Sequence, residues 1–160
     1  MRRSSNLSSG RHKFRVKTLR ELAADATEVA ADKVYVIPPK GALTIEKLRL
    51  RLRQFRRQPG ARMQIDGFFR SLASDRGPRG IAVILSGTGT DGTLGARAVK
   101  EAGGLVVVQD PDGAEFDGMP RSAISAGTAD LVLPPSDMPA ALARYSRQGY
   151  LRQSEAVQED

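Results

Sequence analysis

The sequence has no cysteine and one histidine, His12, in 160 residues. The absence of cysteine excludes disulfides, thiolate metal sites and cysteine nucleophiles. A single histidine excludes a metal site built on a pair of histidines and leaves little for acid–base catalysis. We therefore expect neither a metal nor a cofactor.

Long apolar runs are also missing. No stretch approaches the roughly 20 apolar residues that a membrane-spanning helix needs. The basic N-terminus, residues 1–10, is not followed by the apolar segment of a secretory signal. These absences predict a soluble, cytoplasmic protein without membrane insertion.

Charge is unevenly distributed along the chain, which carries a formal net charge of +7. Residues 1–62 hold sixteen Lys and Arg against five Asp and Glu, whereas residues 63–160 hold nine against thirteen. The second half therefore has the composition of an ordinary folded core. Residues 1–28 are predicted to be a basic segment that is poorly ordered or weakly helical. Its weak helical pattern is carried by Leu19, Leu22 and Ala26.

Short elements are predicted between residues 33 and 74. Lys33–Ile37 is an apolar run ended by two prolines, which predicts a buried strand. Leu43–Ile45 and Leu48–Leu52 alternate with period 2, which predicts a hairpin with all three leucines of the second strand facing inward. Ile65–Ser74 has helical spacing, with Asp66 as the expected N-cap.

The clearest pattern is a β–α–β unit. Ile81–Leu85 predicts a buried strand, Ser86–Gly92 a glycine-rich turn, and Thr93–Ala102 a helix that buries one face. Two glycines end that helix, and Leu105–Gln109 predicts the next buried strand. Such a unit implies parallel strands joined by a right-handed crossover. The helix face comprises Leu94, Ala98 and Val99.

A helix at Pro120–Ala126, a strand at Ala129–Leu133 and a helix at Asp137–Tyr145 complete the predicted fold. The fold class is α/β, a doubly wound, Rossmann-like parallel sheet in three layers, preceded by a small β-hairpin. We place one domain at residues 29–143, followed by a polar tail at 144–160. No internal repeat is visible.

The turn Ser86–Gly92 has the Gly-x-Gly-x-x-Gly spacing of a dinucleotide-binding fingerprint, with Asp110 as the candidate ribose ligand. Two residues argue against that interpretation. Asp91 would face the pyrophosphate with like charge, and Ser86 places a polar group before the first glycine. A dinucleotide-binding module therefore stays a third alternative.

Asp91 is the candidate functional group of the same turn. A carboxylate fixed at the carboxyl end of a strand can orient a catalytic histidine and stabilise its imidazolium. The alternative is that Asp91 only caps the helix that follows. In that case Asp91→Asn would change stability little, because asparagine caps helices equally well.

Several longer motifs together resemble the CheB-type protein-glutamate methylesterase domain of bacterial chemotaxis, in the form fused with the receptor methyltransferase. The resemblance runs from about Val29 to about Leu142. It implies a doubly wound parallel sheet and hydrolysis of glutamyl methyl esters on chemoreceptors, with glutamine deamidation as a second activity. The motifs are Val34-Tyr-Val-Ile-Pro-Pro39, Ser86-Gly-Thr-Gly-Thr-Asp-Gly92, Lys100-Glu-Ala-Gly-Gly104, Val108-Gln-Asp-Pro111 and Ala114-Glu-Phe-Asp-Gly-Met-Pro-Arg-Ser-Ala-Ile124.

The resemblance also assigns residues and partners. It makes Asp91 the aspartate of a Ser–His–Asp triad and the N–H of Thr88 an oxyanion donor, with Gly89 and Met119 beside the cleft. The implied partners are the cytoplasmic helices of methylated chemoreceptors, and a receptor methyltransferase or histidine-kinase module.

The serine and histidine motifs of that family do not occur in this sequence. The nucleophile belongs to a Gly-x-Ser-x-Gly-Gly motif and the histidine to a Gln-His motif, both of which precede the part matched here. Ser4–Ser9 lack the flanking strand and glycines, and His12 is interpreted as a solvated surface residue. We therefore expect an N-terminally truncated fragment with little or no activity. The runner-up is a non-catalytic remnant that binds receptors or a partner chain.

Two charged clusters remain. Residues 49–62 hold six arginines, which we interpret as the solvated face of a hairpin. The alternatives are a surface that binds nucleic acid and one that binds acidic receptor helices. The absence of a known binding motif argues against nucleic acid. The acidic loop at 110–117 lacks the spacing of an EF-hand, so its carboxylates are expected to be loop and cap residues. The arginines are Arg49, Arg51, Arg53, Arg56, Arg57 and Arg62, and the acidic residues are Asp110, Asp112, Glu115 and Asp117.

Overall fold

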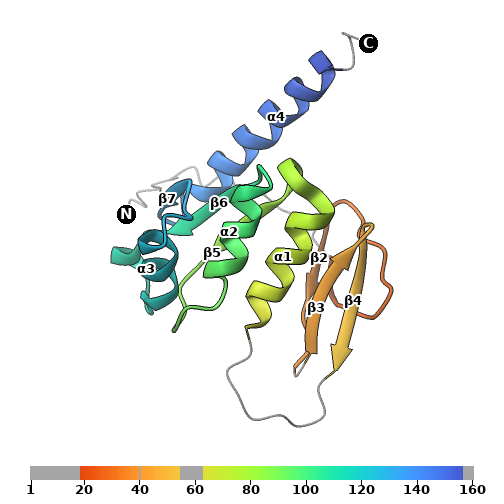
Figure 1. The fold of residues 1–160 in the computed structure, drawn as a ribbon, viewed down its shortest axis with the longest axis horizontal. Coiled ribbons are helices and arrows are strands. Elements are labelled where there is room, and N and C mark those ends of the chain that lie inside the picture. Colours follow the sequence, from red (N-terminus) through yellow and green to blue (C-terminus); the bar gives the residue numbers. More distant parts are fainter. Residues whose placement is uncertain (1–18, 40, 55–62, 157–160) are drawn as a thin grey trace, which may run out of the picture.

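A computed structural model describes residues 19–39, 41–54 and 63–156 (Figure 1). The strands in this part of the chain are β1 (Leu19–Leu22), β2 (Lys33–Val36), β3 (Gly41–Glu46), β4 (Arg49–Gln54), β5 (Ile81–Ile84), β6 (Leu105–Gln109) and β7 (Leu131–Leu133). The α-helices are α1 (Gln64–Arg76), α2 (Thr93–Glu101), α3 (Gly118–Ser125) and α4 (Met138–Ala156).

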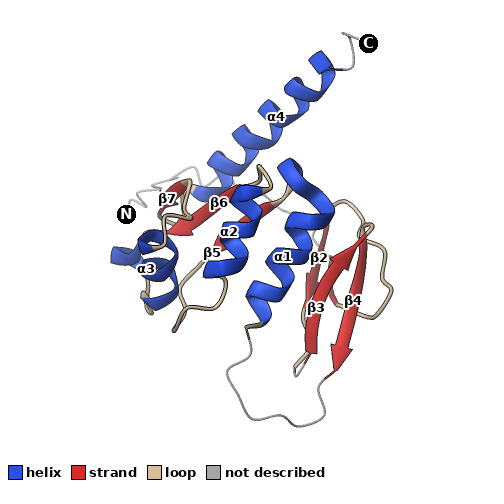
Figure 2. Ribbon diagram, in the orientation of Figure 1, coloured by secondary structure: helices blue, strands red, loops and turns tan. Residues whose placement is uncertain are grey.

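The largest sheet consists of β5, β6 and β7, which are adjacent in that order and parallel. Helices α1, α2 and α3 cover one face of this sheet, and the first turns of α4 cover the other (Figure 2). The predicted three-layer α/β fold with a parallel sheet is therefore confirmed. In the described part of the chain, no helix is both long and apolar enough to span a membrane.

Strand β6 forms the centre of the core. Successive side chains of a strand point to opposite faces of its sheet. Val106 and Val108 accordingly pack toward α1 and α2, whereas Val107 packs toward Met138 of α4. All three valines are fully buried. A strand covered on both faces reads as an unbroken apolar run, which is why its sequence predicted it well.

The weak helical pattern near the N-terminus was misleading. Residues Leu19–Leu22 form strand β1, which pairs in parallel with β2. The pairing continues beyond the strand, because Ala23 N donates to Val36 O at 2.8 Å. Ala26 then has a φ of +61°, which is incompatible with a right-handed helix. Leu19 and Leu22 therefore belong to a strand, and Ala26 belongs to the turn that follows it.

Strand β2 exists as predicted, but it is not a buried strand. Val34 and Val36 remain 44% and 43% exposed. Tyr35, which points to the opposite face, is half-buried and packs against the core of the β3–β4 hairpin. One face of the two-stranded β1–β2 sheet is therefore packed, and the other is open in the described structure.

The β3–β4 hairpin is confirmed, with Glu46 paired to Arg49. Leu50 faces inward, but Leu48 does not, because Lys47 and Leu48 form the two-residue turn. Both turn residues have positive φ, at +50° and +59°, as a type I′ turn requires. Asp75 of α1 holds this strained turn by accepting hydrogen bonds from the backbone N–H groups of both residues.

The helices lie close to their predicted positions. Two features differ, namely the buried face of α2 and the end of α4. On α2, Leu94 is 47% exposed, because the helix instead turns Gly95, Ala96 and Val99 toward α1 and the sheet. Helix α4 continues to Ala156, so it includes most of the predicted polar tail, and it projects away from the body (Figure 1).

Candidate functional site

A loop at residues 86–92 joins β5 to α2 at the carboxyl edge of the parallel sheet. The predicted position of Asp91, between a strand and a helix at this edge, is therefore confirmed. Ligands of parallel α/β sheets bind outside the carboxyl ends of the strands. The loop is accordingly the candidate functional site.

Two side chains anchor the loop to the sheet. Gln109 is buried at the end of β6, and its Oε1 accepts a hydrogen bond from Ser86 N at 2.9 Å. Its Nε2 donates to Gly113 O at 3.1 Å. Ser86 Oγ accepts from Phe116 N at 2.9 Å. These bonds connect the loop to β6 and to the segment that precedes α3.

The loop also packs against the beginning of α3. Gly87 N donates to Phe116 O at 2.8 Å, and Met119 N donates to Gly87 O at 2.9 Å. A Cβ at Gly87 would overlap Met119 Sδ, so the methionine fills the space beside this glycine. The structure thus brings Met119 and the loop together.

Thr88 and Gly89 form the exposed tip of the loop. Gly89 has a φ of +83°, which glycine adopts without strain. Among the described residues, neither the N–H of Thr88 nor that of Gly89 has a hydrogen-bond partner. Exposed N–H donors at this edge are able to bind a negatively charged oxygen.

Asp91 caps a helix, but not the helix predicted. Its Oδ2 accepts a hydrogen bond from Ile65 N at 3.1 Å, and its Oδ1 accepts one from Asp66 N at 3.0 Å. Both donors belong to the first turn of α1, whose positive dipole end therefore lies beside the carboxylate. Helix α2 has Gly92 at its N-cap position. The interpretation of Asp91 as the cap of the following helix is wrong.

Asp66 makes the reciprocal contact. Its Oδ1 accepts a hydrogen bond from Gly95 N, in the first turn of α2, at 2.6 Å. The prediction that Asp66 caps its own helix is wrong, because Met63 occupies that N-cap position. Asp66 is only 2% exposed, and its Oδ2 has no hydrogen-bond partner among the described groups. The first turn of α1 is thus capped by Asp91 from the loop that precedes α2, and the first turn of α2 donates a hydrogen bond to Asp66 of α1.

The glycine spacing of the loop is explained by protein packing. The space that Gly87 leaves open is filled by Met119, and a Cβ at Gly92 would lie 2.9 Å from Ile65 Cγ2. Asp110 accepts a hydrogen bond from Asp112 N and caps a short 3₁₀ turn. The structure therefore gives no support to a dinucleotide site.

Three carboxylates of the acidic loop, those of Asp110, Asp112 and Asp117, make the local contacts expected of loop and cap residues. Asp117 Oδ2 accepts a hydrogen bond from Arg121 Nε at 2.5 Å, one turn along α3. This bond lowers the pKa of Asp117 below its ordinary value and raises that of Arg121. Within the described residues, no group of three or more His, Asp or Glu is arranged to hold a metal ion.

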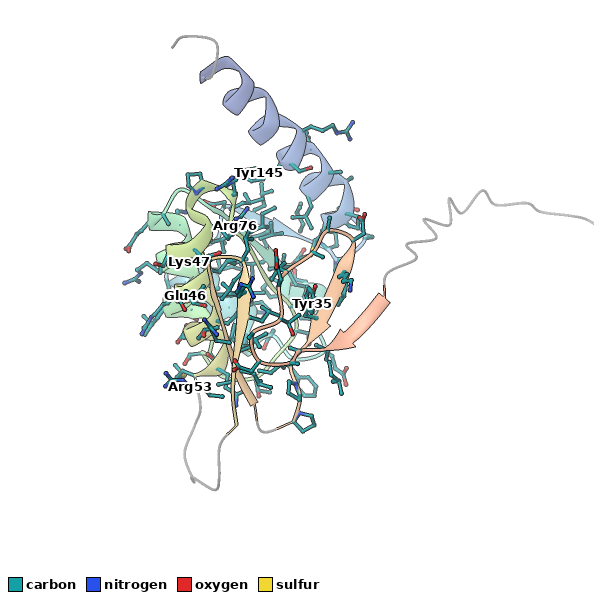
Figure 3. The ribbon with its side chains drawn as sticks, turned by 90° about the vertical axis from the view of Figure 1, so that its right-hand side faces the viewer. Tyr35, Glu46, Lys47, Arg53, Arg76 and Tyr145 are labelled. Carbon is teal, nitrogen blue, oxygen red and sulfur yellow. The ribbon has the colours of Figure 1, made fainter. Side chains whose placement is uncertain are left out.

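The described part of the basic cluster lies on the exposed hairpin, which faces the viewer in Figure 3. Arg49 forms an ion pair with Glu28 at 3.3 Å, and Arg51 with Glu46 at 3.6 Å. These ion pairs partly neutralise the arginines, which agrees with the interpretation of this hairpin face as solvated. Outside the described residues lie Ser4, Ser5, Ser8, Ser9, His12, Arg56, Arg57 and Arg62.

Fold and site together define a parallel α/β domain with a fixed carboxylate beside free N–H donors at the carboxyl edge of its sheet. A sequence model of the CheB methylesterase family matches residues 9–142, so the chain belongs to that family. The match begins well before Val29, the start that the sequence motifs indicate. It includes β1 and the segment that contains His12.

Individual relatives cover parts of this chain, and one of them carries a methylesterase name. The chain is 49% identical over 78 residues to the protein-glutamate methylesterase/protein-glutamine glutaminase of Moorella thermoacetica, covering 49% of this chain and 18% of that protein. It is 50% identical over 109 residues to a 104.1 kDa protein of Rhodobacter capsulatus, covering 68% and 11% respectively. The chain therefore spans only a small part of either relative.

A solved structure shows the same fold. The CheB methylesterase catalytic domain of Thermotoga maritima superposes with a TM-score of 0.67 at 34% identity, covering 76% of this chain and 67% of that domain. About a third of the solved domain thus has no counterpart here.

Sequence reasoning missed the residues that hold the loop in place. Gln109 is the only polar residue in the strand Leu105–Gln109, and a polar residue ending an apolar strand at the carboxyl edge was a usable signal. Asp66 and Gly95 gave no comparable signal, because their contact joins residues 29 positions apart.

Proposed function

We propose that this chain forms the aspartate-bearing part of a protein-glutamate methylesterase site. The observation that carries the proposal is the Asp91 carboxylate of the loop, which two backbone N–H groups of α1 hold in place. In this role Asp91 orients a catalytic histidine and stabilises its imidazolium. Thr88 N–H donates to the oxyanion of the tetrahedral intermediate, and Gly89 and Met119 shape the loop that presents it.

The proposed reaction is hydrolysis of a glutamyl methyl ester. A serine hydroxyl attacks the ester carbon, methanol leaves, and water hydrolyses the acyl-enzyme to give glutamate and the free serine. Glutamine follows the same course with ammonia as the leaving group. The substrates are methylated, cytoplasmic chemoreceptor helices, and a receptor methyltransferase or histidine-kinase module is a partner.

The serine and histidine come, in this proposal, from residues outside these 160. The sequence contains no Gly-x-Ser-x-Gly-Gly motif, and its only histidine is His12. The chain by itself should therefore release little or no methanol. In a serine protease, loss of triad members leaves about 10³–10⁴-fold acceleration over water, a small part of the whole.

The test begins with the coding DNA upstream of Met1. In-frame codons for Gly-x-Ser-x-Gly-Gly and Gln-His would define an extended protein, and methanol release from methylated receptor is then measured for both lengths. The proposal expects turnover only in the extended protein. Turnover by the 160-residue chain at the rate of an intact relative would contradict it.

A non-catalytic, partner-binding domain is the second candidate. The observation in its favour is that both oxygens of Asp91 already join the loop to the first turn of α1, a structural role that needs no catalysis. Stop codons directly upstream would support this candidate, together with receptor binding by the 160-residue chain without methanol release.

A further inference from the structure

We propose that Asp66 is a positioning residue for Asp91. It fixes the first turn of α2 to the first turn of α1. It thereby also fixes the Asp91 carboxylate, which lies in the loop just before α2. The inference rests on the proposed function only in so far as Asp91 is taken to be a catalytic residue. The coupling itself is a property of the described fold.

The contacts form a closed ring. Asp91 accepts from the backbone N–H of Asp66, and the side chain of Asp66 accepts from the backbone N–H of Gly95. Gly95 is joined to Asp91 by one turn of chain. Asp91 therefore cannot move away from α1 without stretching a bond of the ring.

The two helices approach closely enough for this ring only because residue 95 is glycine. A Cβ at Gly95 would lie 2.6 Å from Phe69 Cβ and 2.8 Å from Asp66 Cα. Any larger residue would push α2 away from α1. Because residue 95 has no side chain, its N–H comes close enough to form the short bond to Asp66 Oδ1.

Asp66 is also an unusual residue for a purely structural cap. Caps are ordinarily exposed or half-exposed, whereas Asp66 is 2% exposed and its Oδ2 has no partner among the described groups. A buried, unpartnered carboxylate oxygen is destabilising and calls for a specific explanation in a native structure. Placement of a functional carboxylate is such an explanation.

Helix α1 gives the ring a fixed support. At the other end of the helix, Asp75 holds the hairpin turn through Lys47 N and Leu48 N. In its middle, Ser71 Oγ accepts from Ile45 N at 3.0 Å. Because α1 is held along its length, the contacts at Asp66 fix Asp91 relative to a rigid helix.

Amide hydrogen exchange of the 160-residue chain tests the proposal. Ile65 N–H donates to Asp91 and does not contact the Asp66 side chain, so its protection reports the placement of Asp91. In Asp66→Ala we expect exchange at Ile65 to accelerate at least about tenfold relative to Val107 in the core. Asp66→Asn keeps an acceptor for Gly95 and should restore most of the protection.

Asp75→Asn is the matched control, because it removes the same charge from the other end of α1. It should accelerate exchange at Leu48 and leave Ile65 unchanged. If Asp66→Ala accelerates exchange at Gly95 alone, Asp66 is only a local cap and the proposal is overturned.

The reverse measurement keeps the proposal testable if Asp66→Ala does not fold. In Asp91→Ala the acceptor for Asp66 N is removed and the ring is opened at its other side, so exchange at Gly95 should accelerate relative to Val107. Unchanged exchange at Gly95 would overturn the proposal. Neither readout depends on turnover, so failure of the coupling and failure of the proposed methylesterase function are separate results.

Discussion

Asp91→Asn distinguishes the role seen in the structure from the one that the sequence suggested. An ordinary N-cap tolerates this exchange, because one side-chain oxygen is enough for capping. Asp91 uses both oxygens, one for Ile65 N and one for Asp66 N. Asparagine has only one oxygen, so its amide NH₂ would face a backbone N–H donor.

The expected cost follows from these two contacts. The variant loses a charge-assisted hydrogen bond and leaves a half-buried donor without a partner, which together cost about 1.5–3 kcal/mol. Loss of the negative charge beside the α1 N-terminus removes about 0.3–1 kcal/mol more. We therefore expect the free energy of unfolding to fall by about 2–4 kcal/mol. For a chain of this size that corresponds to a Tm lower by roughly 4–16 °C.

Urea denaturation of the 160-residue chain, followed by circular dichroism, measures this change. Asp32→Asn is the matched control, because Asp32 is exposed and has a φ of +59°, which asparagine also tolerates. Its free energy of unfolding should change by less than about 0.5 kcal/mol. If Asp91→Asn is no more destabilising than this control, Asp91 does not cap α1 and the reasoning is refuted.

Three further substitutions test the surroundings of the loop. Gly95→Ala should lower the free energy of unfolding, measured by urea denaturation, by about 1–3 kcal/mol, because the added Cβ overlaps α1. This loss outweighs the higher helix propensity of alanine. A neutral or stabilising result would contradict the close approach of the two helices. Gln109→Leu should cost about 1–3 kcal/mol because Ser86 N loses its buried acceptor, and unchanged exchange at the Ser86 amide would contradict this. Arg121→Gln should raise the pKa of Asp117, measured by carboxyl ¹³C titration. The lowered pKa means that the pair stabilises the fold above the unfolded-state pKa of Asp117 and that this contribution is lost as pH falls through its folded-state value.

Local pattern was sufficient for the β5–α2–β6 unit. Ile81–Leu85 and Leu105–Gln109 are apolar runs of strand length with a glycine-rich turn after the first, and their neighbours in the sheet are also near in sequence. The carboxyl-edge position of Asp91 followed directly from that order. The same local pattern did not predict which residues hold the loop, because Gln109 and Phe116 reach it from other parts of the chain.

Long-range contacts determined the features that the sequence did not predict. Leu48 alternates correctly for a strand, yet a two-residue turn held by Asp75 of α1 takes it out of β4. Val34 and Val36 have the composition of buried strand residues, but one face of their sheet lacks a covering element in the described chain. Asp91 was assigned to the nearest helix in sequence, whereas its donors lie 25 and 26 residues away.

The structural and the proposed catalytic roles of Asp91 are compatible on grounds of acceptor capacity. An ionised carboxylate offers about four lone-pair sites, of which Ile65 N and Asp66 N occupy two. The remaining sites are able to accept an imidazole N–H without breaking the cap. Capping and catalysis are then separable by magnitude. A loss of about 2–4 kcal/mol leaves most molecules folded in a domain stable by about 5–15 kcal/mol. The corresponding change in a serine-protease triad lowers turnover by about 10⁴. A loss of that size in the extended protein, measured well below its Tm, would therefore come from the catalytic role alone.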